Sequence, residues 1–348
     1  MTAASPKNIV ASVRARLLNL AKAHGEDYNR TLQRYANERY LYRLGSSPYR
    51  DRFVLKGGML LPALGQSIYR PTRDIDLLGS GDTGEAALRV IFTEITATPV
   101  EPDGLTFDVA GINLGPIGAL EAYGGVQILI PALLGSAAVP VRIDIGIGDA
   151  VTPAPVEAAY PTLLDMPSPI LRMYPVETVI AEKFEAMVRF GLANTRIKDY
   201  YDIWTLARTQ SLCGQVLADA FRNTFDRRGT ALPVAAPTGL TDTFLRDRAR
   251  AAQWLRFTAQ YAPTGEVPEL HAAGGLLQRF LMPPATAAAT QTTFTLAWSP
   301  EIGWRWPIWH PTTPMNAAAP GGPLIRGCRG RFAPRYRCAY SLVTPHPT

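Results

Sequence analysis

The sequence predicts an α+β protein in which a mixed core of strands and helices is preceded and followed by helices. Apolar residues recur at helical spacing before residue 44 and again from residue 176 onward. Between these two regions, apolar runs of strand length alternate with one longer amphipathic segment. We therefore divide the chain into N-terminal helices at 1–50, a core at 51–175, a helical part at 176–282 and a tail at 283–348.

The N-terminal helices are expected within 7–44, where Val10, Val13 and Leu17 begin an apolar stripe. Frequent Pro between residues 146 and 175 predicts loops that wrap the core. The elements of the core itself are short and separated by turns: strands at 53–55, 74–78, 107–109, 125–130 and 139–145, and helices at 58–64 and 86–97.

Helices are expected again after residue 176, because Val176, Val179, Phe184 and Met187 form one apolar face. The tail shows no sustained hydrophobic period and is rich in Pro, Ala, Thr and Gly, so we expect it to be poorly ordered. The other helices of the helical part are predicted at 199–208, 215–225 and 241–261.

The bulk composition fits a soluble globular protein. Of 348 residues, 47% are hydrophobic and 18% are charged, and no apolar run is long enough to span a membrane. Three widely spread Cys suggest neither a disulfide framework nor a zinc site, so a reducing cytoplasm is expected. The net charge is +6, but six Arg and one Glu after residue 282 account for +5 of it. Overall charge therefore supports an RNA partner only weakly.

Two carboxylates one residue apart, Asp74 and Asp76, are the main candidates for a functional site. In a strand they share one face, roughly 7 Å apart, and such a pair repels unless a cation lies between them. The turn at Gly57 and Gly58, which follows Lys56, offers backbone N–H groups that can face phosphate. Together these features are what metal-assisted phosphoryl or nucleotidyl transfer needs. The alternative is an exposed, inert Asp-x-Asp on an edge strand.

Asp144 is the best candidate for a third carboxylate, since it lies in a predicted strand and a buried Asp is costly unless it is paired or metal-bound. The alternative is that Arg142 and Asp144 simply occupy a solvent-facing side of the strand. Asp108 and Asp149 are weaker substitutes.

Lys183 falls on the apolar stripe of its predicted helix, so it either reaches an anion in a cleft or extends to solvent. Asp199 lies in the first turn of the next helix, where an acidic residue also favours the helix dipole. Asp199 shares a helix face with Asp202. If these two helices pack together, Lys183 and Asp199 could both point at the strand carboxylates.

Four segments, at 53–58, 73–77, 177–183 and 198–204, together resemble the AbiEii/MenT-type nucleotidyltransferase toxins, and the resemblance spans about residues 25–282. It implies a polymerase-β-like nucleotidyltransferase core. It also implies transfer of NMP from an NTP with Mg²⁺ or Mn²⁺, in known members onto the 3′ end of tRNA, and a cognate antitoxin as protein partner.

The resemblance also assigns roles to residues. Asp74 and Asp76 would hold metal, Lys183 would contact the nucleotide phosphates, and Asp199 would be the catalytic acidic residue of the last motif. The residue pattern adds Asp144 as the candidate third metal ligand, and the turn segment Lys56, Gly57 and Gly58 as a candidate for nucleotide binding.

One position departs from the family pattern. Members often carry Ser or Thr shortly after the Gly pair, whereas Met59 follows here, so a phosphate contact would have to come from backbone N–H groups or from elsewhere. Two alternatives stay open at this point. One is a nucleotidyltransferase for a small molecule such as an aminoglycoside, and the other is a catalytically inactive binding protein of the same fold.

Overall fold

A seven-stranded mixed sheet forms the centre of the first half of the protein. The structure is a computed structural model that describes residues 8–65, 72–117, 125–261 and 267–306 of the chain. The strand order is β4-β5-β8-β2-β1-β10-β9, in which β2–β8 and β1–β10 are parallel pairs. The strands are β1 (Phe53–Lys56), β2 (Asp74–Gly79), β4 (Asn113–Pro116), β5 (Gly125–Ile130), β8 (Val141–Ile147), β9 (Val156–Ala159) and β10 (Ile170–Met173).

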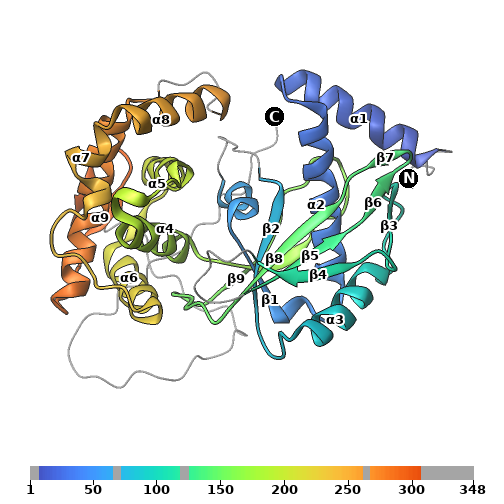
Figure 1. Ribbon diagram of the computed structural model, residues 1–348, viewed down its shortest axis with the longest axis horizontal. Coiled ribbons are helices and arrows are strands. Elements are labelled where there is room, and N and C mark those ends of the chain that lie inside the picture. The colour runs from blue at the N-terminus through green and yellow to red at the C-terminus, as the bar shows by residue number, and fades with distance from the viewer. Residues whose placement is uncertain (1–7, 66–71, 118–124, 262–266, 307–348) are drawn as a thin grey trace, which may run out of the picture.

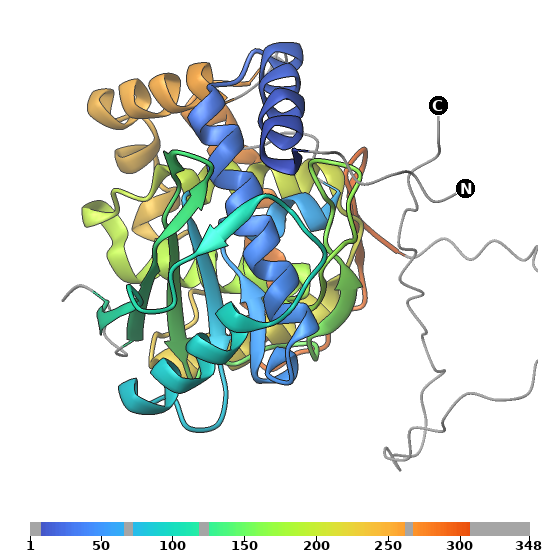
Figure 2. The ribbon, with the colours of Figure 1, turned by 90° about the vertical axis from the view of Figure 1, so that its right-hand side faces the viewer.

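Three helices, α1 (Ile9–His24), α2 (Tyr28–Ser46) and α3 (Glu85–Ala97), lie on one side of this sheet, and α2 crosses its face (Figure 2). Local signals set the helix boundaries, since the side chains of Asn8 and Asp27 cap the N-termini of α1 and α2. The ring of Phe53 on β1 lies 5.3 Å from that of Phe92 on α3. Because side chains alternate along a strand, Lys56 lies on the opposite face, away from these helices.

The second half of the chain is helical and lies on the other side of the sheet (Figure 1). Its core includes Phe184, whose ring lies 5.1 Å from that of Phe221 and 5.6 Å from that of Phe225. No helix among the described residues is both long and apolar enough to cross a membrane. The helices are α4 (Val176–Phe190), α5 (Ile197–Thr209), α6 (Gly214–Arg228), α7 (Asp242–Leu245), α8 (Arg248–Tyr261) and α9 (Leu270–Ala289).

The expectation of loops throughout 146–175 is wrong, because β9 and β10 complete one edge of the sheet. Each strand has only four residues, and β10 pairs with β1, which is far away in sequence. The helix expected at 241–261 is two helices, α7 and α8. A small second sheet joins β3 (Leu105–Phe107), β6 (Ala132–Leu134) and β7 (Ala137–Ala138). The strand expected at 107–109 therefore shares only residue 107 with the observed strand β3.

The expected poorly ordered tail also requires correction for its first part, residues 283–306. Helix α9 continues through Pro283 and Pro284, and β12 (Ala297–Ser299) and β13 (Gly303–Arg305) form a sheet with β11 (Leu212–Cys213). Trp298 anchors this hairpin, since its indole N–H donates to the carbonyl of Ala207 at 2.7 Å. This part of the tail therefore belongs to the helical part. Residues 307–348 lie outside the described residues.

Candidate functional site

Four polar residues form one row across the middle of the sheet, on the face away from α2 and α3. Asp76 on β2 is paired in register with Lys56 on β1 on one side and with Asp144 on β8 on the other. Asp144 is in turn paired with Gln127 on β5, whose side-chain amide donates to it at 2.9 Å. We call Lys56, Asp76, Asp144 and Gln127 the acidic row. The strand register thus places two of the predicted metal ligands side by side.

The acidic row is short of positive charge. Burial raises the pKa of Asp76, and the charges of Asp144 and Asp74 add to this, while Lys56 and Lys198 oppose it. The pKa of Asp144 is raised as well, by burial and by the charge of Asp74, although the Gln127 amide offsets part of the shift. A divalent cation beside these carboxylates would restore their ionised forms.

Gly57 brings a backbone turn directly against Asp76. Its φ of +67° lies in the region that favours glycine, and a Cβ at this position would overlap the Asp76 carboxylate and lie 2.7 Å from the Asp76 Cβ. The turn opens the short 3₁₀ helix η2 (Gly58–Leu64). Met59, which directly follows the glycine pair, is buried beneath this turn, with its sulfur 4.0 Å from the side-chain nitrogen of Asn37 on α2. Met59 therefore points away from the acidic row.

Asp74 does not join the other two carboxylates in a closed metal site. It lies 3.5 Å from the guanidinium of Arg142 on the neighbouring strand. Within the ranges described, no three side chains of His, Cys, Asp or Glu are arranged to hold a metal ion. Mg²⁺, however, is usually bound by one or two carboxylates together with waters and substrate phosphates. Asp76 and Asp144 fit a cation that an NTP would help to coordinate.

Lys183 and Asp199 contact each other. The Lys183 ammonium lies 2.7 Å from carboxylate oxygens of both Asp199 and Asp202, and Arg196 binds the second oxygen of Asp199 at 2.6 Å. Although burial opposes ionisation, Lys183 and Arg196 hold the pKa of Asp199 well below its usual range. Lys183 and Asp199 thus bind each other, and that both point at the strand carboxylates stays a prediction. The charge of Lys198, in the first turn of α5 next to Asp199, acts on Asp76.

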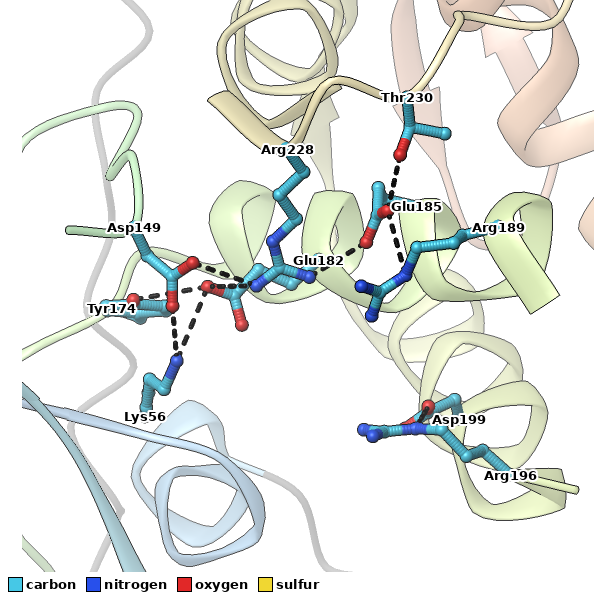
Figure 3. Close-up of polar contacts among 10 residues, drawn as sticks. All are labelled: Lys56, Asp149, Tyr174, Glu182, Glu185, Arg189, Arg196, Asp199, Arg228 and Thr230. Atoms are coloured by element: carbon cyan, nitrogen blue, oxygen red, sulfur yellow. Dashed lines mark hydrogen bonds and ion pairs between the residues drawn. The ribbon is translucent and has the colours of Figure 1, made fainter. Parts of the chain in front are cut away.

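Lys56 also belongs to a second cluster that the sequence did not reveal. Its ammonium lies 2.6 Å from Asp149, which follows β8, and 3.7 Å from Glu182 on α4. Arg228, at the end of α6, contacts the same two carboxylates at 3.1 and 3.2 Å (Figure 3). We call Lys56, Asp149, Glu182 and Arg228 the Lys56–Arg228 network. Asp199 lies apart from this network (Figure 3).

The only signal of this network in the sequence is weak. Asp149 was a minor candidate for metal binding, and instead it pairs with two cations, which lower its pKa to about 2 although burial opposes this. Arg228 looks like an ordinary basic residue in the last turn of a helix. Its partners come from distant segments, so spacing along the chain could not identify it.

Two neighbouring strand carboxylates that can hold a divalent cation, beside a glycine turn whose backbone N–H groups can face phosphate, fit metal-assisted nucleotidyl transfer. The family model described as "Nucleotidyl transferase AbiEii toxin, Type IV TA system" matches residues 39–275, and this chain belongs to that family. The expected family, the α+β fold with a mixed sheet and the nucleotidyltransferase class of enzyme are thereby confirmed. The family implies an NTP substrate and an antitoxin partner.

Solved structures show more distant similarity. A crystal structure of a protein from H. pylori assigned as a nucleotidyltransferase is 14% identical with a TM-score of 0.40, and the match covers 75% of this chain and 95% of that one. The crystal structure of JHP933 from Helicobacter pylori is 15% identical with a TM-score of 0.39, covering 75% and 92% of the two chains. No curated protein matches this chain.

Proposed function

We propose that this protein is a toxin that transfers NMP from an NTP to the 3′ end of tRNA, using Mg²⁺ or Mn²⁺, in the cytoplasm, where NTPs and tRNA are found. Family membership supports nucleotidyl transfer and a cognate antitoxin that restrains it. The observation that carries the proposed chemistry is the position of Asp76, between Lys56 and Asp144 and directly beneath the Gly57 turn.

In this proposal Asp76 and Asp144 hold the cation, and Asp74 joins them by exchanging its contact with Arg142. A cation bound there would neutralise charge on the triphosphate and on the departing pyrophosphate. The terminal hydroxyl of the acceptor attacks the α-phosphorus, the bond from that phosphorus to the bridging oxygen breaks, and pyrophosphate leaves. Asp144, which a bound cation would keep ionised, accepts the hydroxyl proton.

Lys56 and the backbone of Gly57 and Gly58 bind the triphosphate on the other side of Asp76. Lys183 contributes a phosphate contact by exchanging Asp202 for a phosphate oxygen, while Asp199 stays ionised and keeps the lysine charged and in place. Asp199 thus acts through Lys183.

The test is incubation of the protein with each labelled NTP, total tRNA and Mg²⁺. Asp76→Asn should abolish incorporation without unfolding the protein. Lys183→Ala should abolish it too, with thermal melting measured in parallel because Asp199 and Asp202 lose their shared lysine. Asp108→Asn is a matched control, because Asp108 lies in an exposed turn and its Oδ1 accepts the Ala110 N–H at 3.0 Å, a bond that Asn can keep. Full incorporation by Asp76→Asn would refute the assignment. Labelling of an aminoglycoside in place of tRNA would favour the small-molecule alternative.

A further inference from the structure

Arg228 lies where three acidic side chains from two parts of the fold meet. It is in the last turn of α6, which ends at Gly229 with φ +63°, and its side chain is 13% exposed. Beyond Asp149 and Glu182, Arg228 binds Glu185 on α4 at 2.9 Å (Figure 3). One guanidinium therefore ties the end of α6 to α4 and to the loop after β8. Such fork-shaped contacts are specific to arginine.

Lys56 connects this network to the acidic row. Its side chain starts beside Asp76 and passes along Gly146 on β8, where a Cβ would lie 3.3 Å from the lysine nitrogen. Its ammonium ends between Asp149 and Glu182. Lys56 is the neighbour of Asp76 across β1 and β2, so its ammonium brings a positive charge close to the proposed metal site. The position of that charge depends on Asp149 and Glu182, which hold the ammonium.

The charge balance of the network depends on Arg228. Without Arg228, Asp149 and Glu182 would have to share the single ammonium of Lys56 in a largely dry site. Two carboxylates held that close do not both stay ionised, so one of them would take up a proton and release its hold on the lysine. Burial and the charge of Asp149 already raise the pKa of Glu182, while Lys56 and Arg228 oppose this.

We propose that Arg228 is a positioning residue for nucleotidyl transfer, which keeps Asp149 and Glu182 charged so that they hold Lys56 beside Asp76. The inference rests on the proposed function. The proposed positioning role of Arg228 also affects Lys183. Glu182 is the residue before Lys183 on α4, and its contact with Lys56 on β1 ties that helix to the sheet. The charged and titratable groups that face Glu182 are Lys56 from β1, Asp149 after β8, Tyr174 after β10 and Arg228 from α6. Glu185, further along α4, binds Arg228 and Arg189.

The experiment compares Arg228→Met with Arg189→Met in the full chain. Arg189 is a matched control, because it also binds Glu185, at 3.3 Å, but its side chain lies away from Lys56 (Figure 3). Arg228→Met should lower kcat for NTP incorporation about 10- to 100-fold, the range found for residues that support metal ligands. As the pH is lowered, the activity of Arg228→Met should also begin to fall at a higher pH than that of wild type. Arg189→Met should match wild type in both respects.

A second pair of variants separates positioning from stability. Arg228→Met combined with Glu182→Gln leaves one carboxylate for one ammonium and should return the acid side of the pH profile toward wild type, whereas Arg228→Lys should be intermediate. Thermal melting and calorimetric binding of Mg²⁺–NTP accompany each measurement. Should Arg228→Met not fold, Arg228→Lys against Arg189→Lys gives the same contrast.

Equal activity of wild type and a folded Arg228→Met at every pH would overturn the inference. A loss of activity with an unchanged pH profile and no recovery in the double variant would also overturn it, since that is the signature of a purely structural arginine. Absence of incorporation by wild type itself would instead refute the proposed function.

Discussion

Asp76 on the sheet and Asp199 on α5 are both carboxylates near a lysine, yet their surroundings act on them in opposite directions. Burial and two neighbouring carboxylates raise the pKa of Asp76, whereas Lys183 and Arg196 hold that of Asp199 low in spite of burial. Around Asp76, Lys56 and Lys198 do not offset burial and the neighbouring carboxylates, whereas Asp199 is already neutralised by Lys183 and Arg196. The acidic row is therefore the place that fits a metal ion. The cluster of Lys183, Asp199, Asp202 and Arg196 is already charge-paired and needs no metal ion to be stable.

The largest expected difference between Asp76 and Asp199 is in the stability of their variants. Asp199→Asn should destabilise the protein by about 3 kcal/mol, the lower end of the range for removing one partner of a buried ion pair, because Asp202 still binds Lys183. Asp76→Asn should not lower the melting temperature of the metal-free protein, since it removes a charge that burial disfavours. Denaturant unfolding of both variants without metal measures the contrast. Equal destabilisation would show that the two environments are alike.

The next effect is expected at the glycine turn. Gly57→Ala should cost about 1–3 kcal/mol, because the positive φ strains any other residue and the added methyl overlaps Asp76. It should also abolish NTP incorporation by displacing that carboxylate. Gly65→Ala is the control, since Gly65 has a similar φ of +71° but open space where a Cβ would lie. If the two variants lose activity equally, the contact between Gly57 and Asp76 has no role.

Much of this site follows from local rules. Strand alternation puts Asp74 and Asp76 on one face, and the burial pattern of β2 confirms it. A glycine pair after a strand predicted the turn that lies against Asp76. The helices were predictable for the same reason, because their apolar stripes and caps are local in sequence.

What could not be predicted depends on partners that are distant in sequence. Strand β10 is recognisable only through its pairing with β1, and the hairpin of β12 and β13 only through the burial of Trp298. The same holds for charges. Lys183 on an apolar stripe was compatible with a cleft or with solvent, and the packing of α4 against α5 decided that it would meet Asp199 and Asp202.

A smaller effect is expected in the pH dependence of stability. A carboxyl group whose pKa is raised in the folded state stabilises it while protonated, so the contribution of Asp76 is present below its unfolded pKa and is lost as pH rises through the folded value. The contribution of Asp199 depends on pH in the opposite direction, because its pKa is lowered in the folded state. That stabilisation is present above the pKa of the unfolded state and is lost as pH falls through the pKa of the folded state.

The measurement is the melting temperature against pH, without metal, for wild type, Asp76→Asn and Asp199→Asn. From mildly acidic to neutral pH, wild type should lose stability relative to Asp76→Asn as pH rises. Added Mg²⁺ and a nonhydrolysable NTP should cancel that loss, since ligand binding favours the ionised carboxylate. Parallel curves for wild type and Asp76→Asn would contradict the proposed electrostatics of the acidic row.

The smallest effect concerns the pair between Arg142 and Asp74. Their side chains are 48% and 36% exposed, so Arg142→Met should change the free energy of unfolding by less than about 1 kcal/mol. If Asp74 joins the metal site during turnover, releasing it from Arg142 should lower the Mg²⁺ concentration needed for half-maximal incorporation. Arg172→Met, on β10 and bound to the carbonyl of Asp51, should leave the Mg²⁺ requirement unchanged. An increased Mg²⁺ requirement in Arg142→Met would mean that the arginine itself contacts the nucleotide, and Asp74 would then lose its place among the proposed ligands.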